Sequence, residues 1–226
     1  MKRTNRLCKA ADSRLPGVAM RILFFGDSNT YGYDPAGYME MRYPQHQRWT
    51  YLLQQMDPGK WEILPEGMNG RTIPDLRYDA ARIHRMIRSL KQEDLFAVML
   101  GTNDILLTMD PDADPAIEKM RAFLAFLTEE RQPSGILVIA PPQIGRSGVR
   151  DPLYQRYYRE SKRMNAGFEK LADDFGVHFA DAGSWDIDLS ADLVHLSEKG
   201  HRQFAERMGE YLQSILFADK DSEGGT

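Results

Sequence analysis

The sequence predicts an α/β fold in which a parallel five-stranded sheet lies between two layers of helices. Short apolar segments alternate with longer segments whose apolar residues recur at helical spacing, and this alternation repeats along the chain. Successive strand-helix-strand units cross over in the same right-handed sense, so they build a parallel sheet with helices on both faces. A chain of 226 residues with 42% hydrophobic content is long enough to bury the core of one such domain.

The five predicted strands are short, mostly apolar and bounded by turn residues. They are expected at residues 22–25, 61–66, 94–100, 135–140 and 177–180. The first strand, from Ile22 to Phe25, is apolar without interruption, as is typical of a strand covered on both faces. Pro141 and Pro142 end the fourth strand, because proline cannot donate a hydrogen bond within a sheet. The expected architecture is a three-layer α/β/α sandwich of the flavodoxin-like type.

The predicted helices lie between these strands and after the last one. They are expected at residues 47–56, 74–90, 115–129, 153–175 and about 197–216, with Ser197 as a candidate N-cap. Residues 31–46 contain glycine, proline and aromatic residues without a clear period, so we expect a long loop over the strand ends. Ligands of open α/β sheets bind at the carboxyl ends of the strands, and this loop would border that region.

Both ends of the chain lie outside the predicted domain, which spans residues 20–217. We expect residues 1–19 to form a flexible N-terminal extension and the polar, glycine-containing residues 218–226 to form a flexible tail. No apolar segment follows the basic residues of the extension, and no run approaches the roughly 20 apolar residues of a membrane-spanning helix. The single Cys8 cannot form an internal disulfide. These features predict a cytoplasmic protein without a membrane partner.

The charge balance argues against several classes of partner. Twenty-nine basic and 33 acidic residues give a formal charge of −4, and no long basic run indicates a nucleic acid or an anionic membrane surface. Glu62, Glu66 and the pair Asp173-Asp174 are not accompanied by a grouping of histidine or cysteine, so no metal site is expected. We therefore expect a neutral or weakly charged small-molecule partner and no cofactor.

A candidate nucleophile stands where the first strand ends. Gly26-Asp27-Ser28 follows that strand and places Ser28 at the edge of the sheet where ligands bind. Asp-Ser-Asn is also common in helix caps and turns, so this tripeptide alone favours a capped turn. Near the other end of the chain, Asp192-Leu-Val-His195 places a carboxylate within reach of an imidazole. A serine hydroxyl becomes a good nucleophile when such a histidine removes its proton and the carboxylate holds the ring.

Four segments of the chain occur in the order typical of a known hydrolase superfamily. They are Gly26-Asp27-Ser28, Gly70, Gly101-Thr-Asn103-Asp104 and Asp192-Leu-Val-His195. In these segments the chain resembles the SGNH (GDSL-type) hydrolases, from Met20 to about Leu216. It looks most like their arylesterase and acyltransferase branch, through residues 25–33, 48–50, 66–72 and 99–104. Asn29 follows the serine where the family name expects leucine, which changes a wall of the expected pocket. Thr30 stands where the elbow of the α/β-hydrolases needs glycine, so the turn is of a different kind.

The resemblance implies a catalytic triad and an oxyanion hole. Ser28 would be the nucleophile, His195 the general base, and Asp192 the residue that holds the imidazole. The backbone N–H groups of Ser28 and Gly70 and the side-chain amide of Asn103 would stabilise the oxyanion without carrying charge. Taken singly, Gly70 could be a turn glycine and Asn103 a loop residue that bonds its own backbone. Their shared location at strand ends favours the catalytic interpretation.

Four further residues are expected to contact the acyl or alcohol part of a substrate. They are Asn29, Tyr33, Trp49 and Ile144. Trp49 has the alternative of being helix core, because it shares a helical face with other apolar residues. Asp27 and Asp104 are expected to tie loops or cap helices.

The resemblance implies a serine esterase that hydrolyses short-chain aryl or alkyl esters through an acyl-serine intermediate. Water or an alcohol would accept the acyl group, so acyl transfer is a second expected outcome. A homo-oligomer is expected, since this branch commonly builds its pocket walls by oligomerisation. The alternatives are a carbohydrate O-deacetylase, a hydrolase of the lysophospholipase or thioesterase kind, and a binding protein that does not use the triad.

Overall fold

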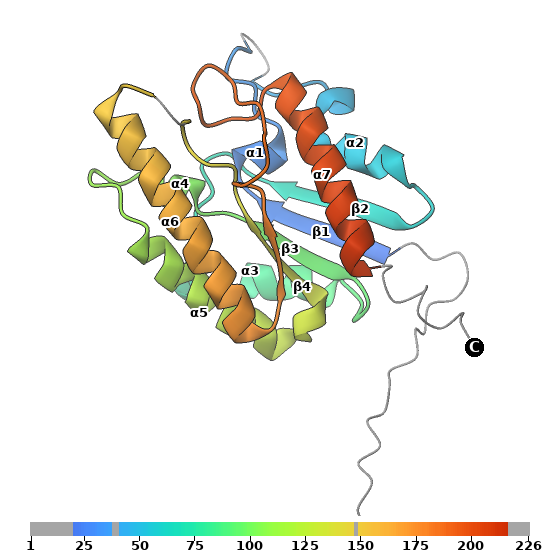
Figure 1. Cartoon of the computed structure of the whole chain (residues 1–226). Coiled ribbons are helices and arrows are strands. Elements are labelled where there is room, and N and C mark those ends of the chain that lie inside the picture. The colour runs from blue at the N-terminus through green and yellow to red at the C-terminus, as the bar shows by residue number, and fades with distance from the viewer. Residues whose placement is uncertain (1–19, 38–40, 147–148, 217–226) are drawn as a thin grey trace, which may run out of the picture.

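The computed structural model describes residues 20–37, 41–146 and 149–216, whose five strands form the predicted parallel sheet (Figure 1). The strands are β1 Met20–Gly26, β2 Trp61–Gly67, β3 Leu95–Met99, β4 Ile136–Ala140 and β5 His178–Asp181. Their order in the sheet is β2-β1-β3-β4-β5. The predicted N-terminal extension, Cys8 and the tail lie outside the described residues.

The helices connect and cover these strands. They are α1 Ser28–Tyr31, α2 Trp49–Met56, α3 Leu76–Arg88, α4 Thr102–Leu106, α5 Asp114–Glu130, α6 Pro152–Phe175 and α7 Glu198–Leu216, with short 3-10 helices at η1 Gln45–Gln47 and η2 Pro133–Gly135. The sequence predicts neither α1 nor α4, because each has too few residues to show helical periodicity. Both follow a strand directly and lie where the candidate site residues are.

The sheet carries an apolar layer on each face, because successive residues of β1 point to opposite sides. Leu23 and Phe25 belong to the core beneath α3, α5 and α6, whereas Ile22 and Phe24 belong to the core beneath α2 and α7 (Figure 1). All four side chains are buried. The predicted three-layer sandwich is therefore confirmed.

Two glycines allow α1 to lie directly on the edge of the sheet. The strand register pairs Gly26 with Gly67 on one side and with Met99 on the other. A side-chain carbon on Gly26 would lie 2.0 Å from Thr30 Oγ1, and one on Gly67 would lie 2.2 Å from the backbone nitrogen of Tyr31. Because close-packed interiors do not accommodate such contacts, both positions require glycine. They hold α1, which begins with Ser28, against the carboxyl ends of β1 and β2.

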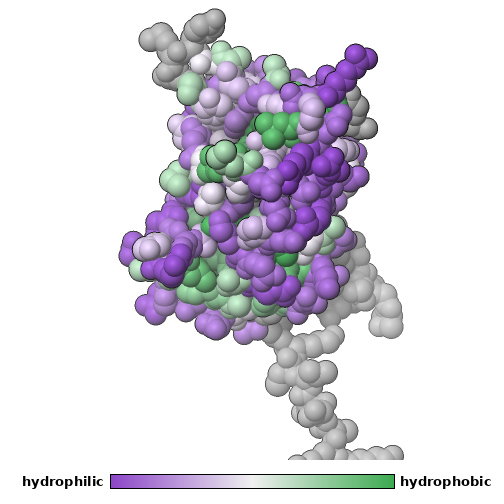
Figure 2. All heavy atoms as spheres, turned by 90° about the vertical axis from the view of Figure 1, so that its left-hand side faces the viewer, coloured by the Kyte–Doolittle hydropathy of each residue, from purple (hydrophilic) through white to green (hydrophobic). Residues whose placement is uncertain are grey.

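The surface on the side of α5 and α6 is largely hydrophilic, and its hydrophobic residues form several separate groups (Figure 2). No helix within the described ranges is both long enough and apolar enough to cross a membrane. The expected homo-oligomer stays a prediction.

Candidate active site

Asp27, and not Ser28, caps the short helix α1. Its Oδ1 atom accepts a hydrogen bond from the N–H of Asn29 at 2.9 Å. The helix ends at Gly32, whose φ of 84° is a conformation that favours glycine. Since Asp27 supplies the cap, the hydroxyl of Ser28 is free to bond elsewhere. The alternative in which Ser28 serves as the helix cap does not describe this turn.

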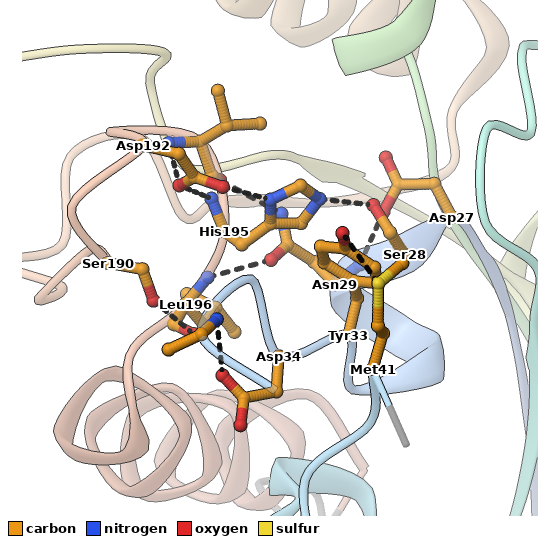
Figure 3. A network of polar contacts seen from close by, with 12 residues as sticks. Asp27, Ser28, Asn29, Tyr33, Asp34, Met41, Ser190, Asp192, His195 and Leu196 are labelled. Atoms are coloured by element: carbon orange, nitrogen blue, oxygen red, sulfur yellow. Dashed lines mark hydrogen bonds and ion pairs between the residues drawn. The ribbon is translucent and has the colours of Figure 1, made fainter. Parts of the chain in front are cut away.

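The hydroxyl of Ser28 begins a chain of hydrogen bonds that continues through His195 to Asp192 (Figure 3). Ser28 Oγ lies 2.9 Å from His195 Nε2, and His195 Nδ1 lies 2.6 Å from Asp192 Oδ2. An ionised carboxylate can only accept, so Nδ1 carries the proton of the neutral imidazole and donates it to Asp192. Nε2 then accepts the hydrogen bond from Ser28, which is the tautomer that a general base needs.

Asp192 is arranged to stay ionised. Burial by itself would raise the pKa of this carboxyl group, but hydrogen bonds from the His195 ring and from the backbone N–H groups of His195 and Val194 outweigh burial and lower the pKa below its ordinary value. The two backbone bonds both end on Oδ1, at 3.0 Å. The second oxygen is thereby turned toward the imidazole, where its negative charge can stabilise an imidazolium.

The loop that carries Asp192 and His195 is held from several directions. It is closed by an antiparallel bridge between Leu189 and Leu196. From α6, the hydroxyl of Tyr154 donates to the carbonyl of Asp192 at 3.1 Å, and from the loop after β4 the N–H of Gly145 donates to the carbonyl of Leu193 at 2.7 Å. Leu193 has a φ of 59°, which is uncommon for a residue other than glycine. These bonds fix the backbone path between Asp192 and His195.

Three uncharged donors follow the carboxyl ends of neighbouring strands. Gly67, Gly26 and Met99 are paired across β2, β1 and β3, and Gly70, Ser28 and Asn103 follow them by three, two and four positions. Within the described part of the chain, the backbone N–H groups of Ser28 and Gly70 have no hydrogen-bond partner. Gly70 has a φ of +71°, which favours glycine at this turn.

Asn103 lies on α4 and is already oriented by one hydrogen bond. Its Nδ2 atom donates to the carbonyl of Arg71 at 3.0 Å, and the side chain is buried. A primary amide has two N–H donors, so one remains for a ligand. The bond to Arg71 also joins the turn after β3 to the turn after β2, next to Gly70.

Residues 24–203 match the GDSL-like Lipase/Acylhydrolase family. The chain belongs to this family. No curated protein matched the sequence.

Solved structures of esterases share the fold over nearly the whole domain. The aryl esterase of M. smegmatis is 26% identical with a TM-score of 0.72, over 88% of this chain and 100% of that chain. A protein assigned as an arylesterase from Agrobacterium tumefaciens str. C58 is 31% identical with a TM-score of 0.70, over 87% and 100% of the two chains. Est24, a carbohydrate acetylesterase from Sinorhizobium meliloti, is 24% identical with a TM-score of 0.71, over 87% and 99%, which shows similarity of fold. The chain is thus an SGNH-type esterase or acylhydrolase by family and fold.

Among the four predicted substrate contacts of this GDSL-like hydrolase, Tyr33 lies beside the candidate site. Its ring centre is 4.6 Å from that of His195, at an interplanar angle of 49°, and the side chain is partly exposed (Figure 3). An aromatic group in this place offers an apolar surface to a ligand bound near Ser28.

The structure corrects the other three predicted contacts. Trp49 and Ile144 are fully buried in the two cores of the sheet, at 0% and 1% exposure. The helix-core interpretation of Trp49 is therefore the right one. Asn29 is also buried. Its side-chain amide forms hydrogen bonds with the carbonyl of Val194 and the N–H of Leu196. All three side chains are surrounded by the protein itself, so none of them offers its surface to a substrate.

Arg71 is a residue of the site region to which sequence reasoning assigned no role. Its buried guanidinium donates from Nη1 to the carbonyl of Gly26 at 2.8 Å and to the carbonyl of Glu66, and it lies over the ring of Phe25. Its own carbonyl accepts from Asn103. Arg71 therefore ties together the ends of β1, β2 and β3. The only indication of this role in the sequence is that Arg71 directly follows Gly70. That position does not reveal that the side chain points into the protein.

The neighbouring carboxylates act as the sequence indicates. Asp104 Oδ2 accepts from the N–H of Ile73 at 2.9 Å and its Oδ1 accepts from Lys119 Nζ at 2.8 Å, which ties α4 to two other segments. Burial raises the pKa of Asp27 to about 6, although the bond from Asn29 and the charges of His195 and Arg71 lower it. Among the residues that the structure describes, no three His, Cys, Asp or Glu side chains are grouped to hold a metal ion.

Proposed function

We propose that the protein is a cytoplasmic serine esterase that hydrolyses short-chain carboxylic esters, including aryl esters, through an acyl-serine intermediate. The observation that carries this proposal is the continuous hydrogen-bonded chain from Ser28 through His195 to Asp192. A serine, an imidazole and a carboxylate in this order form the machinery of nucleophilic acyl transfer.

In the first half of the reaction, Ser28 Oγ attacks the ester carbonyl carbon while His195 Nε2 takes the hydroxyl proton. The tetrahedral intermediate then collapses: the carbon–oxygen bond to the alcohol breaks, and His195 returns the proton to the departing oxygen. The products are a free alcohol and an acyl group on Ser28. Asp192 holds the imidazole in place and balances its positive charge throughout.

In the second half, a water molecule attacks the acyl carbon while His195 takes one of its protons. The acid is released when the bond to Ser28 Oγ breaks and the proton returns to the serine. An alcohol in place of water would yield a new ester, so acyl transfer belongs to the same proposal.

The charge that develops on the carbonyl oxygen needs donors that are already in place. The N–H groups of Ser28 and Gly70 and the second N–H of Asn103 are suited to this, since each is uncharged and available. Removing one such donor typically raises the barrier by about 3 kcal/mol. The similarity to the aryl esterase of M. smegmatis and the Tyr33 ring beside His195 support aryl esters within the substrate range.

The test uses p-nitrophenyl esters of increasing acyl length with the native protein and with Ser28→Ala. We expect turnover that is highest for the shortest acyl groups and absent in the variant, and covalent labelling of Ser28 by a fluorophosphonate. Retained turnover in folded Ser28→Ala would refute the proposal. An unlabelled Ser28 in native protein would favour a binding protein instead.

The choice between water and alcohol is tested by adding benzyl alcohol to the same reaction. Formation of the benzyl ester would establish acyl transfer, and hydrolysis alone at high alcohol would remove transfer from the proposal.

A further inference from the structure

The side chain of Asn29 joins the nucleophile helix to the backbone on both sides of His195. Its Oδ1 atom accepts from the N–H of Leu196 at 2.9 Å, and its Nδ2 atom donates to the carbonyl of Val194 at 3.3 Å. These two residues flank His195 in the chain. Figure 3 shows the Asn29 amide beside the histidine ring, with its bond to Leu196. One planar amide thus holds the segment that carries the imidazole.

The backbone of Asn29 is held as firmly as its side chain. Its N–H donates to the cap residue Asp27 at 2.9 Å, and its carbonyl accepts from Trp49 Nε1 at 2.9 Å. Trp49 is itself fully buried against Phe24 and Phe204. The side-chain amide of Asn29 therefore has a fixed position, and it holds the backbone of Val194 and Leu196 in place.

The two bonds require an asparagine in chemical terms. The carbonyl of Val194 needs a donor and the N–H of Leu196 needs an acceptor, and a primary amide presents one of each in a single plane. Leucine has a similar size and neither group. With leucine at position 29, the buried N–H of Leu196 and the partly buried carbonyl of Val194 would lose their partners. That loss favours a shift of the loop toward water or toward other bonds.

We propose that Asn29 is a positioning residue that sets the approach of His195 Nε2 to Ser28 Oγ, acting through the backbone of Val194 and Leu196. The inference rests on the proposed esterase function. Asn29 belongs to the same turn as Ser28. Its two side-chain hydrogen bonds therefore fix the distance between His195 and Ser28 directly, and not only through the strands that connect the two segments. Small displacements of a reacting group by about 1 Å can lower a rate by about 100-fold.

The test compares Asn29→Leu with Asn165→Leu as the matched control. Asn165 is also a buried asparagine whose amide bonds a backbone carbonyl, that of Pro141 at 3.0 Å, and it takes no part in the proposed mechanism. Both variants lose a buried amide, so both are expected to unfold at lower denaturant concentration. Only Asn29→Leu should lower kcat for p-nitrophenyl acetate per folded molecule, by about 10- to 100-fold, with KM nearly unchanged.

A second readout separates positioning from substrate binding. The rate at which a fluorophosphonate labels Ser28 reports the activation of the hydroxyl, and it should fall in Asn29→Leu in parallel with kcat and stay native in Asn165→Leu. If Asn29→Leu does not fold, Asn29→Ser replaces it, because a small polar side chain leaves room for water while still being too short to reach both backbone groups. The same loss of kcat and labelling is expected there.

The outcomes distinguish this inference from the proposed function. Native kcat and labelling in a folded Asn29 variant, together with inactive Ser28→Ala, would overturn the positioning role and leave the esterase intact. Equal losses of kcat in the Asn29 and Asn165 variants would also overturn it, since the effect would then be general. Turnover by Ser28→Ala would instead overturn the proposed function.

Discussion

The guanidinium of Arg71 donates to the carbonyl oxygen of Gly26 at 2.8 Å, across 45 positions of the chain. Gly26 is the last residue of β1, and Ser28 follows two positions later. The carbonyl of Arg71 in turn accepts from Asn103 at 3.0 Å. The buried Arg71 therefore links the turn that carries Ser28 to two of the three candidate oxyanion donors, which are Asn103 and the adjacent Gly70.

Arg71→Lys is expected to lower kcat about 10-fold and to destabilise the fold by about 1–3 kcal/mol, because an ammonium group cannot reproduce the planar fork of the guanidinium. The measurements are steady-state kinetics and urea unfolding. Arg77→Lys is the control, since that arginine is exposed and, in the described structure, contacts only the nearby Asp75 and the ring of Tyr78. Equal effects at the two positions would count against a special role for Arg71.

Asp192→Asn should leave the fold intact and reduce kcat by roughly 10³- to 10⁴-fold, because an amide can donate to His195 Nδ1 and so favour the wrong imidazole tautomer. Kinetics with p-nitrophenyl acetate and circular dichroism check the two parts of this statement. Asp186→Asn, on an exposed residue of a neighbouring loop, is the control. If Asp192→Asn lowered kcat by less than about 10-fold, as a surface variant such as Asp186→Asn could, Asp192 would not be the residue that orients the base.

Asn103→Ala is expected to lower kcat by about 10²- to 10³-fold with a much smaller rise in KM, because a donor to the oxyanion acts mainly in the transition state. The separate determination of kcat and KM checks this. An effect confined to KM would assign Asn103 to ground-state binding of the ester.

Asp27→Asn should stabilise the protein at neutral pH. Burial raises the pKa of Asp27 from 3.8 to about 6 in the folded state. The folded state therefore holds a proton that the unfolded state has lost between about pH 4 and 6, so ionisation costs stability as the pH rises through this window. Above it the cost reaches at most about 3 kcal/mol. Asparagine keeps the acceptor for the Asn29 N–H and carries no charge.

Urea unfolding of native protein and Asp27→Asn across the pH range measures this difference. The variant is expected to be the more stable at about pH 7. Its advantage should shrink as the pH falls from about 6 to about 4 and vanish below about pH 4, where Asp27 is protonated in both the folded and the unfolded state. A difference that does not change with pH would mean that Asp27 is not the group that titrates.

The positions of the strands along the chain, and of Ser28, Gly70 and Asn103 after them, followed from local patterns. Uninterrupted apolar segments such as Ile22 to Phe25 have one stable environment, the middle of a covered sheet, and the reactive residues stand directly after such segments. Parallel strands present their carboxyl ends at one edge, so Ser28, Gly70 and Asn103 were expected to come together there.

The sequence by itself determined the fold class and the family and supplied the candidate reactive groups, because apolar periodicity and motif order are properties of the chain. Only the tertiary structure decided which side chains face the site. Trp49 and Ile144 are core residues. Asn29 bonds the backbone on both sides of His195, and the buried side chain of Arg71 bonds the end of β1. In each case the direction of the side chain decides its role. That direction depends on the packing of segments up to 167 positions apart, which no local pattern contains.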